Sequence, residues 1–323
     1  MSYTKKYFGF YPDKPTWLGS GLNITELSNL QSVGAVLAKQ EFAYNSSNFE
    51  VIGCRDGLFL IHLKFSGCTV GTYLDYLNAF YIALESSLSQ YNFGKFFNLK
   101  EITIEDYIYH EYNESKILNY QIENINTRSK YLYLARFLSG YIPVDFEKID
   151  YINNIFWKNL LTHVITNDQR TLLKKGRIIQ IESINQACKN FERLSQNYEY
   201  VQLLAQLIKA VEEMNLGNYE QVVSYSWLII EAYLYRIYYT NKSRYSQAIG
   251  DENLSSLEVI NGLKGMKALP YEIVGELHEL RKIRNQIIHS QYKDVTMAQA
   301  QLSIEVIREF IKRDTAVDIR LMF

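Results

Sequence analysis

The stretch ELRKIRNQIIHSQY, Glu279–Tyr292, decides how the C-terminal part of this chain is interpreted. Its apolar residues recur at helical spacing, which continues upstream to Ile273 and predicts one amphipathic helix. On a helical wheel started at Ile273, at about 100° per residue, the expected buried stripe comprises Val274, Leu277, Leu280, Ile283, Ile287 and Ile288. By the same arithmetic Arg284 lies about 20° from the start of this stripe. A buried guanidinium without a partner is costly, so Arg284 is expected to be paired or to face an anion.

A second stripe of the same helix carries polar side chains suited to chemistry. His278, Asn285 and His289 lie roughly 120° to 160° around the wheel, beside the apolar stripe. The sequence therefore predicts a ridge of imidazole, amide and imidazole next to the arginine.

The preceding helix offers Arg284 a partner. Between Val222 and Tyr239 the sequence carries two charged residues, Glu231 and Arg236, in an otherwise uncharged and largely apolar run. We expect a Glu231–Arg284 ion pair that satisfies both groups and orients the guanidinium. The alternative is that Glu231 pairs with Arg236 or extends to the surface.

Residues 196–315 as a whole predict a compact all-α domain. Apolar positions at helical spacing continue through VQLLAQLIKAVEEM, YEQVVSYSWLIIEAYLYRIYY and SSLEVINGL. A turn is expected at Leu216-Gly217-Asn218, Pro270 is expected to open a helix, and Thr296 to cap the last one. Residues 316–323 are expected to form a C-terminal tail.

The first third of the chain predicts a different fold class. FEVIGCRDGLFLIHLKFSG, residues 49–67, indicates two strands around an Arg-Asp-Gly turn. A helix is expected from Thr72, and an alternating segment from Leu99 to the NESK stretch predicts a further strand. Residues 1–120 are thus expected to form a small α+β domain, with a sensor or regulatory role as one option.

Residues 121–195 are expected to form a helical connector. KYLYLARFL (residues 130–138), DYINNIFWKNLLTHVI (150–165) and INQACKNFERL (184–194) all show helical spacing.

Composition excludes several classes of function. The net charge of −1 gives no overall basic field for nucleic acid, so any such site must be local. Three cysteines without CxxC spacing favour a reducing compartment. The N-terminus lacks a signal-peptide core, and no apolar run is long enough for a membrane span. We expect a soluble cytoplasmic protein without membrane contact.

Familiar cofactor and metal motifs are absent. GxxxxGK[ST], GxGxxG, HExxH, paired CxxC and GxSxG do not occur, so no cofactor and no metal site is expected. Glu114-Ser115-Lys116, downstream of Asp106, faintly resembles the ExK element of metal-dependent nucleases. A charged hairpin tip is the alternative interpretation.

Arg284-Asn285-Gln286-Ile287-Ile288-His289 resembles the Arg-x(4–6)-His motif of HEPN domains, including their frequent asparagine after the arginine. The setting is similar too: an all-α domain, a preceding helix with an internal glutamate, and the motif late in the domain. The resemblance covers residues 196–315 and is closest to HEPN domains of abortive-infection and anti-phage proteins of the ApeA-like group. Arg55 and His62 also fit the loose pattern, but they lie across a predicted turn and strand.

The resemblance implies a two-fold homodimer whose two motifs meet in a metal-independent endoribonuclease site that cleaves RNA in phage defence or as a toxin. Arg284 would stabilise phosphorane charge, Asn285 would orient the ring or hold a phosphate oxygen, and His289 would transfer protons. His278 would line the rim or lie on a solvated surface, with Glu231 behind Arg284.

One departure bears on regulation. Some HEPN toxins carry a modified tyrosine two residues after the motif histidine, where this chain has Gln291, with Tyr292 next. A self-contained protein, triggered by a phage component or another signal through its N-terminal domain, fits better than control by an antitoxin. The alternative function is a non-catalytic helical module that dimerises and binds nucleotides, RNA or a protein.

Overall fold

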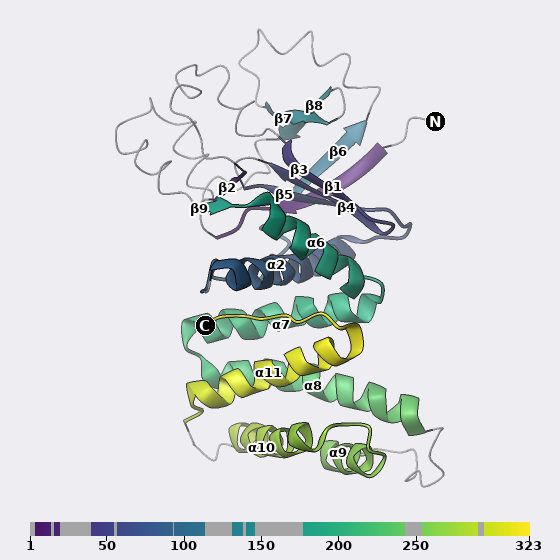
Figure 1. The fold of residues 1–323 in the computed structure, drawn as a ribbon, viewed down its shortest axis with the longest axis vertical. Coiled ribbons are helices and arrows are strands. Elements are labelled where there is room, and N and C mark those ends of the chain that lie inside the picture. The colour runs from purple at the N-terminus through teal and green to yellow at the C-terminus, as the bar shows by residue number, and fades with distance from the viewer. Residues whose placement is uncertain are drawn as a thin grey trace. The chain divides into compact units, whose positions relative to one another are not determined.

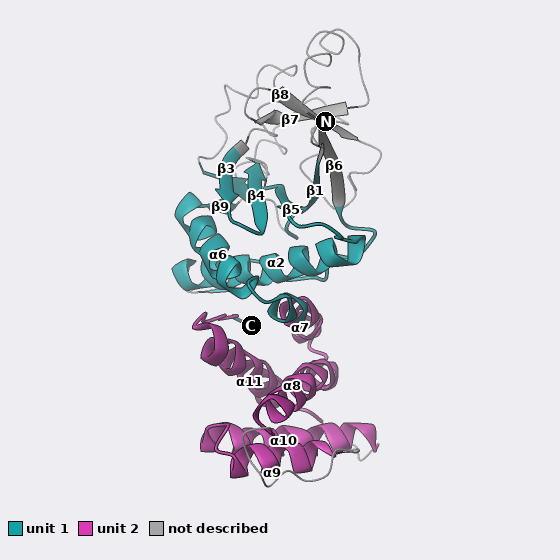
Figure 2. Ribbon diagram, turned by 90° about the vertical axis from the view of Figure 1, so that its right-hand side faces the viewer, with its two compact units in different colours: residues 1–202, 322 teal, residues 203–321, 323 magenta. Residues whose placement is uncertain are grey.

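The computed structural model describes residues 4–13, 16–19, 40–54, 57–92, 94–113, 131–137, 140–145, 177–242, 254–289 and 294–323 (Figure 1). The chain divides into two compact units, Met1–Gln202 with Met322 and Leu203–Leu321 with Phe323 (Figure 2). In the described part, strands occur in unit 1 and helices alone in unit 2. This confirms the predicted order of an α+β region followed by an all-α region. The two units divide between Gln202 and Leu203.

A five-stranded antiparallel sheet forms the centre of unit 1, in the order β3-β4-β5-β1-β6. Its strands are β1 (Thr4–Phe10), β3 (Gln40–Asn45), β4 (Phe49–Cys54), β5 (Phe59–Leu63) and β6 (Ile108–Asn113). β4 and β5 are the two strands predicted within residues 49–67, and they pair from Phe49 opposite Leu63 to Gly53 opposite Phe59.

Aromatic side chains fill the space between this sheet and α2 (Val70–Asn92), the helix predicted from Thr72. Phe8 stacks on Tyr73 with ring centroids 4.0 Å apart, and Phe59 meets Phe80 at 5.8 Å. α6 (Ile181–Leu194), also predicted as a helix, packs on α2 and adds Phe191 to this cluster. Stacked and edge-to-face aromatic rings therefore form a large part of the core of unit 1.

Two buried polar side chains of α2 hold the segment that follows it. The carboxylate of Glu85, 2% exposed, accepts hydrogen bonds from the backbone N–H groups of Phe96 (2.8 Å) and Phe97 (2.7 Å). The amide of Asn78 bonds both backbone groups of Ile102 at 2.8 and 3.0 Å. These bonds take up backbone groups that a sheet would otherwise use. The strand predicted from Leu99 consequently begins only at Ile108.

A hairpin occupies part of the predicted helical connector. β7 (Tyr131–Phe137) and β8 (Gly140–Asp145) pair antiparallel, so the prediction of a helix over residues 130–138 was wrong. Short apolar runs satisfy both the helical and the alternating pattern, which explains the error. β8 lies close to β6 and β7 close to β3, the two edges of the central sheet. The expected helix at 150–165 and residues 114–116 of the NESK stretch lie outside the described residues.

A short parallel pair completes the described strands of unit 1. It joins β2 (Thr16–Leu18) to β9 (Arg177–Ile179), and neither strand was predicted from the sequence.

Unit 2 is built on α8 (Tyr219–Lys242), which packs against α9 (Ser256–Gly265), α10 (Tyr271–Ile288) and α11 (Met297–Thr315). α7 (Tyr198–Leu216) precedes them. The predicted turn and helix starts are confirmed. Gly217 has φ +78° in the turn after α7, Pro270 is the N-cap of α10, and Thr296 forms a capping box at the start of α11. Trp227 and Phe310 are among the largest buried side chains.

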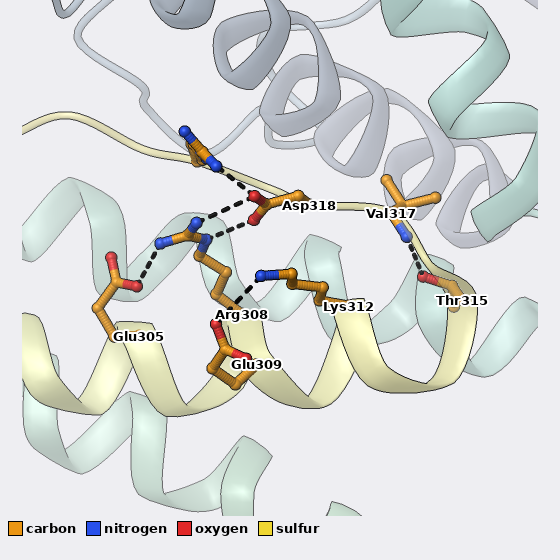
Figure 3. A network of polar contacts seen from close by, with 8 residues as sticks. Glu305, Arg308, Glu309, Lys312, Thr315, Val317 and Asp318 are labelled. Carbon is orange, nitrogen blue, oxygen red and sulfur yellow. Dashed lines mark hydrogen bonds and ion pairs between the residues drawn. The ribbon is translucent and has the colours of Figure 1, made fainter.

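Residues 317–319 of the C-terminal tail lie against α11 (Figure 3). Val317 and Ile319 are each 2% exposed, and Asp318 between them points to Arg308 of α11. Arg308 donates from Nε (2.6 Å) and Nη2 (3.1 Å) to the two oxygens of Asp318, and from Nη1 to Glu305 (2.6 Å). The bidentate pair of Arg308 and Asp318 fixes the direction of the chain after the helix.

Candidate functional site

The predicted motif lies on the last two turns of α10. The first part of the expected apolar stripe is buried, namely Ile273, Val274, Leu277, Leu280 and Ile283. The stripe then stops, because Ile287 is half-buried and Ile288 is 54% exposed, contrary to the prediction. The neighbouring helices therefore cover α10 as far as Ile283 and leave its final turn open to solvent.

Arg284 lies at the edge of this opening and not in the core. Its side chain is half-buried, and Nη1 donates to Oδ1 of Asn285 at 3.2 Å. No acidic side chain of the described part pairs with it. A guanidinium has five donors, so this one contact leaves most of its hydrogen-bonding capacity for another acceptor.

Glu231 has a different partner from the one predicted. Its carboxylate accepts a hydrogen bond from Oγ of Ser256, at the start of α9. Arg236, the alternative partner, pairs instead with Asp314 at 3.2 Å. The Glu231–Arg284 pair is therefore absent, and Glu231 is bonded to α9 instead. Glu231 fastens two helices of the unit and does not orient the arginine.

His289 caps the C-terminal end of α10. Its backbone N–H donates to the carbonyl oxygen of Asn285 at 3.0 Å, and its side chain is exposed. Among the described residues, the amide of Asn285 accepts a hydrogen bond from Arg284 and makes none with the imidazole, so its expected role in orienting the ring is not seen. Arg284, Asn285 and His289 thus share one open helix end, with the amide oriented by the guanidinium.

His278 lies two turns before Asn285 on the predicted ridge and is half-buried. Burial lowers the pKa of its imidazole, and the nearby positive charges of Arg281, Lys264 and Lys282 lower it further. These three cations were missed by motif reasoning. The spacing of Arg281 and Lys282, one turn after His278 and one turn before Asn285, was the available signal.

The opposite flank of α10 is acidic. Burial raises the pKa of the Glu276 carboxyl, as do the negative charges of Glu279 and Glu272 on α10 and of Glu309 and Glu305 on α11. The charges of α10 are therefore segregated: the basic flank, with Lys264 of α9, carries the imidazoles, and the acidic flank faces α11.

The remaining sequence candidates contribute nothing to this site. Four of these candidates lie outside the described residues, namely Tyr292, Arg55, Asp56 and the stretch 114–116. His62, the partner of Arg55 in the loose motif match, is buried in β5 of unit 1. Its Nδ1 lies 2.9 Å from the carbonyl oxygen of Lys6, so it serves the sheet.

Unit 2 also exposes apolar surface. On α8 the exposed residues Tyr225 (37%), Leu228 (59%), Ala232 and Tyr239 (48%) recur at helical spacing on one face. Arg236, one turn after Ala232, borders this face and pairs with Asp314.

Comparison with known proteins returned no match among family models, curated proteins or solved structures. In the described ranges, no helix has the length and apolarity needed to cross a membrane. Those same ranges contain no group of three or more His, Cys, Asp or Glu side chains arranged to hold a metal ion.

Proposed function

We propose that this protein is an endoribonuclease of the HEPN type. One observation carries the proposal: Arg284, Asn285 and His289 lie together on the open end of α10, and no acidic side chain of the described part neutralises the arginine. A half-buried guanidinium without a carboxylate is suited to an anion such as a phosphodiester. The exposed imidazole beside it supplies a proton-transfer group.

The chemistry follows from these side chains. One imidazole takes the proton from a ribose 2′-hydroxyl, and the oxygen attacks the adjacent phosphorus. Arg284 stabilises the charge that develops on the non-bridging oxygens, with Asn285 holding the guanidinium in position. A second imidazole gives a proton to the departing 5′-oxygen, which leaves a 2′,3′-cyclic phosphate and a 5′-hydroxyl. Binding and proton transfer by these groups require no metal ion.

Two copies of the chain supply the two imidazoles. A two-fold axis near the end of α10 would bring His289 of both copies to one phosphodiester. Ile288, exposed beside His289, supplies apolar surface for such a pairing.

A role in phage defence, with unit 1 as the part that receives the trigger, rests on the resemblance of residues 196–315 to HEPN domains of defence proteins. The separation of the chain into two compact units is compatible with such a division of labour.

The experiment compares wild type with Arg284→Ala and His289→Ala. Purified wild type should cleave RNA in EDTA and leave 2′,3′-cyclic ends, and its expression should arrest growth or protect against phage. Each variant should fold normally by circular dichroism and lose at least about 100-fold in cleavage rate. Arg313→Ala, which removes an exposed guanidinium of α11, is the matched control and should retain most activity. Equal cleavage by wild type and His289→Ala would overturn the proposal.

A non-catalytic dimerisation module is the second candidate. The exposed apolar residues of α8, Tyr225, Leu228 and Tyr239, favour it, because such a surface suits a helix partner whatever the chemistry of α10. On this alternative, Leu228→Lys abolishes association in analytical ultracentrifugation, whereas His289→Ala leaves every cellular phenotype unchanged.

A further inference from the structure

The basic flank of α10 continues well beyond the motif. Tyr271, His278, Lys282, Asn285 and His289 fall within about 60° of one another on the helical wheel and form what we call the α10 track. Tyr271, at the far end, is 75% exposed, the largest exposed fraction among the described large hydrophobic residues. At about 1.5 Å per residue, the track from Tyr271 to His289 is about 27 Å long.

A cation from another helix strengthens this track. Nζ of Lys264, at the end of α9, lies 5.4 Å from the centroid of the Tyr271 ring. Lys264 and Lys282 are both exposed, and their charges also reach His278. The outer part of the track thus combines an exposed aromatic ring with two exposed cations.

Gly275 lies at the edge of the track, about 20° beyond Lys282 on the wheel, with Tyr271 and His278 on one side and Glu272 and Glu279 on the other. It is exposed, and a Cβ placed there would have no heavy atom within 4 Å. Packing therefore does not require a glycine, although glycine in a helix interior costs about 0.5–1 kcal/mol relative to alanine. A glycine that packing does not explain suits a place where a ligand lies against the backbone.

We propose that the α10 track binds single-stranded RNA, with one base stacked on Tyr271 over the gap at Gly275 and with backbone phosphates on Lys264 and Lys282. This inference rests on the proposed function, since it leads the strand towards Arg284 and His289. The acidic flank, centred on Glu276, repels phosphates and confines the strand to one side of the helix.

The exposed ring of Tyr271 favours single-stranded over double-stranded RNA. An exposed aromatic side chain binds the flat face of a base, which is available in an unpaired strand and hidden in a duplex. Lys264 and Lys282 supply the sequence-independent part of the affinity, as basic residues do in other sites for single strands. A protein with a net charge of −1 has no general attraction for RNA, so binding should depend on this local surface.

Binding of a fluorescent 2′-O-methyl RNA strand tests the proposal, because the blocked 2′-oxygen prevents cleavage. Anisotropy is measured with the full chain at several salt concentrations. Lys264→Ala combined with Lys282→Ala should reduce the slope of log K against log salt by about 1.4, at 0.7 per phosphate. Tyr271→Ala should weaken binding about 5-fold to 150-fold and leave the slope unchanged.

Filling the gap provides a third arm. Gly275→Gln should weaken binding about tenfold or more while the melting temperature stays the same or rises, because the glycine is replaced by a better helix former in open space. The matched controls are Lys209→Ala with Arg313→Ala, which removes two exposed cations elsewhere in unit 2, and Tyr91→Ala, which removes an exposed ring of unit 1. Both should bind like wild type.

The outcomes separate this inference from the proposed function. If the track variants lose binding as stated while no RNA is ever cleaved, the track stands and the ribonuclease assignment falls. If wild type cleaves RNA but the track variants and the controls bind and cleave alike, the track is refuted and the ribonuclease stands. Equal or tighter binding of double-stranded RNA would also overturn the assignment to single strands.

Discussion

Replacing Asp318 by Asn should detach the C-terminal residues from α11. The amide keeps the shape of the side chain but loses the charge that receives two donors of Arg308 and a third, at 2.8 Å, from Nε of Arg320. The hydrogen bonds of Arg308 are the largest cause that lowers the pKa of Asp318 from 3.8 to about 2. At 1.36 kcal/mol per pKa unit, this lowering corresponds to about 2 kcal/mol of stability.

Solvent reduces that figure. The side chains of Asp318 and Arg308 are 24% and 19% exposed, so screening leaves an expected loss of about 1–2 kcal/mol for Asp318→Asn at pH 7. The sign with pH follows from the lowered pKa. The contribution is fully present above pH 3.8, falls to about half near pH 3, and is lost as the pH drops through about 2.

The assay is urea unfolding at pH 7, 4 and 3, followed by hydrogen-exchange protection of peptides from α11. Glu309→Gln is the matched control, because its pair with Lys312 spans 3.8 Å between side chains about half exposed. It should cost less than about 0.5 kcal/mol. The reasoning fails if both variants lose the same stability, or if the gap between wild type and Asp318→Asn stays constant from pH 7 to pH 3.

Three further predictions concern single residues. Ala316→Gly should stabilise unit 2 by about 1 kcal/mol in thermal unfolding, because Ala316 has φ +57° at the C-cap of α11. Glu85→Gln should destabilise unit 1 by about 1–3 kcal/mol in urea, because the amide leaves one of two buried backbone donors without an acceptor. The imidazole of His278 should titrate below 6.5 by NMR, and Lys282→Ala should raise that midpoint. The pKa of His278 is lower in the folded protein than in the unfolded chain, so His278 should favour folding above pH 6.5. This contribution should be lost as the pH falls from 6.5 through the lowered pKa of the folded protein.

Local signals in the sequence predicted local structure well. Pro270, Thr296 and Gly217 mark helix ends and a turn through their own backbone chemistry, which needs no information from distant residues. In α2 and α8 the apolar residues also fit a helical spacing better than the alternation of a strand. These elements were therefore predicted correctly from the sequence alone.

The errors arose where a distant neighbour decides the outcome. Tyr131–Phe137 has the spacing of either a helix or a strand, and its pairing with β8 selects the strand. The helical wheel treats every turn of α10 as equally covered, so it could not show that packing ends after Ile283 and leaves Ile288 exposed. Glu231 was assigned to Arg284 because both needed a partner, whereas the packing of α9 gives it Ser256.

The same limit applies to the site. The arginine, amide and histidine could be grouped from their spacing on one helix, and the structure places them on one open end. Lys264 could not be found in this way, because it belongs to α9 and reaches the flank only through the tertiary packing of the two helices.

The β7–β8 hairpin has a consequence for how the protein behaves at high concentration. The outer strands of a sheet present unsatisfied backbone groups that recruit strands from other molecules, which is a common start of aggregation. In unit 1, β7 lies close to β3 and β8 lies close to β6, and β3 and β6 are the two outer strands of the sheet. The hairpin therefore hinders the addition of a strand from another molecule at both edges. Deleting β7 and β8 should therefore cost solubility more than it costs folding of the sheet.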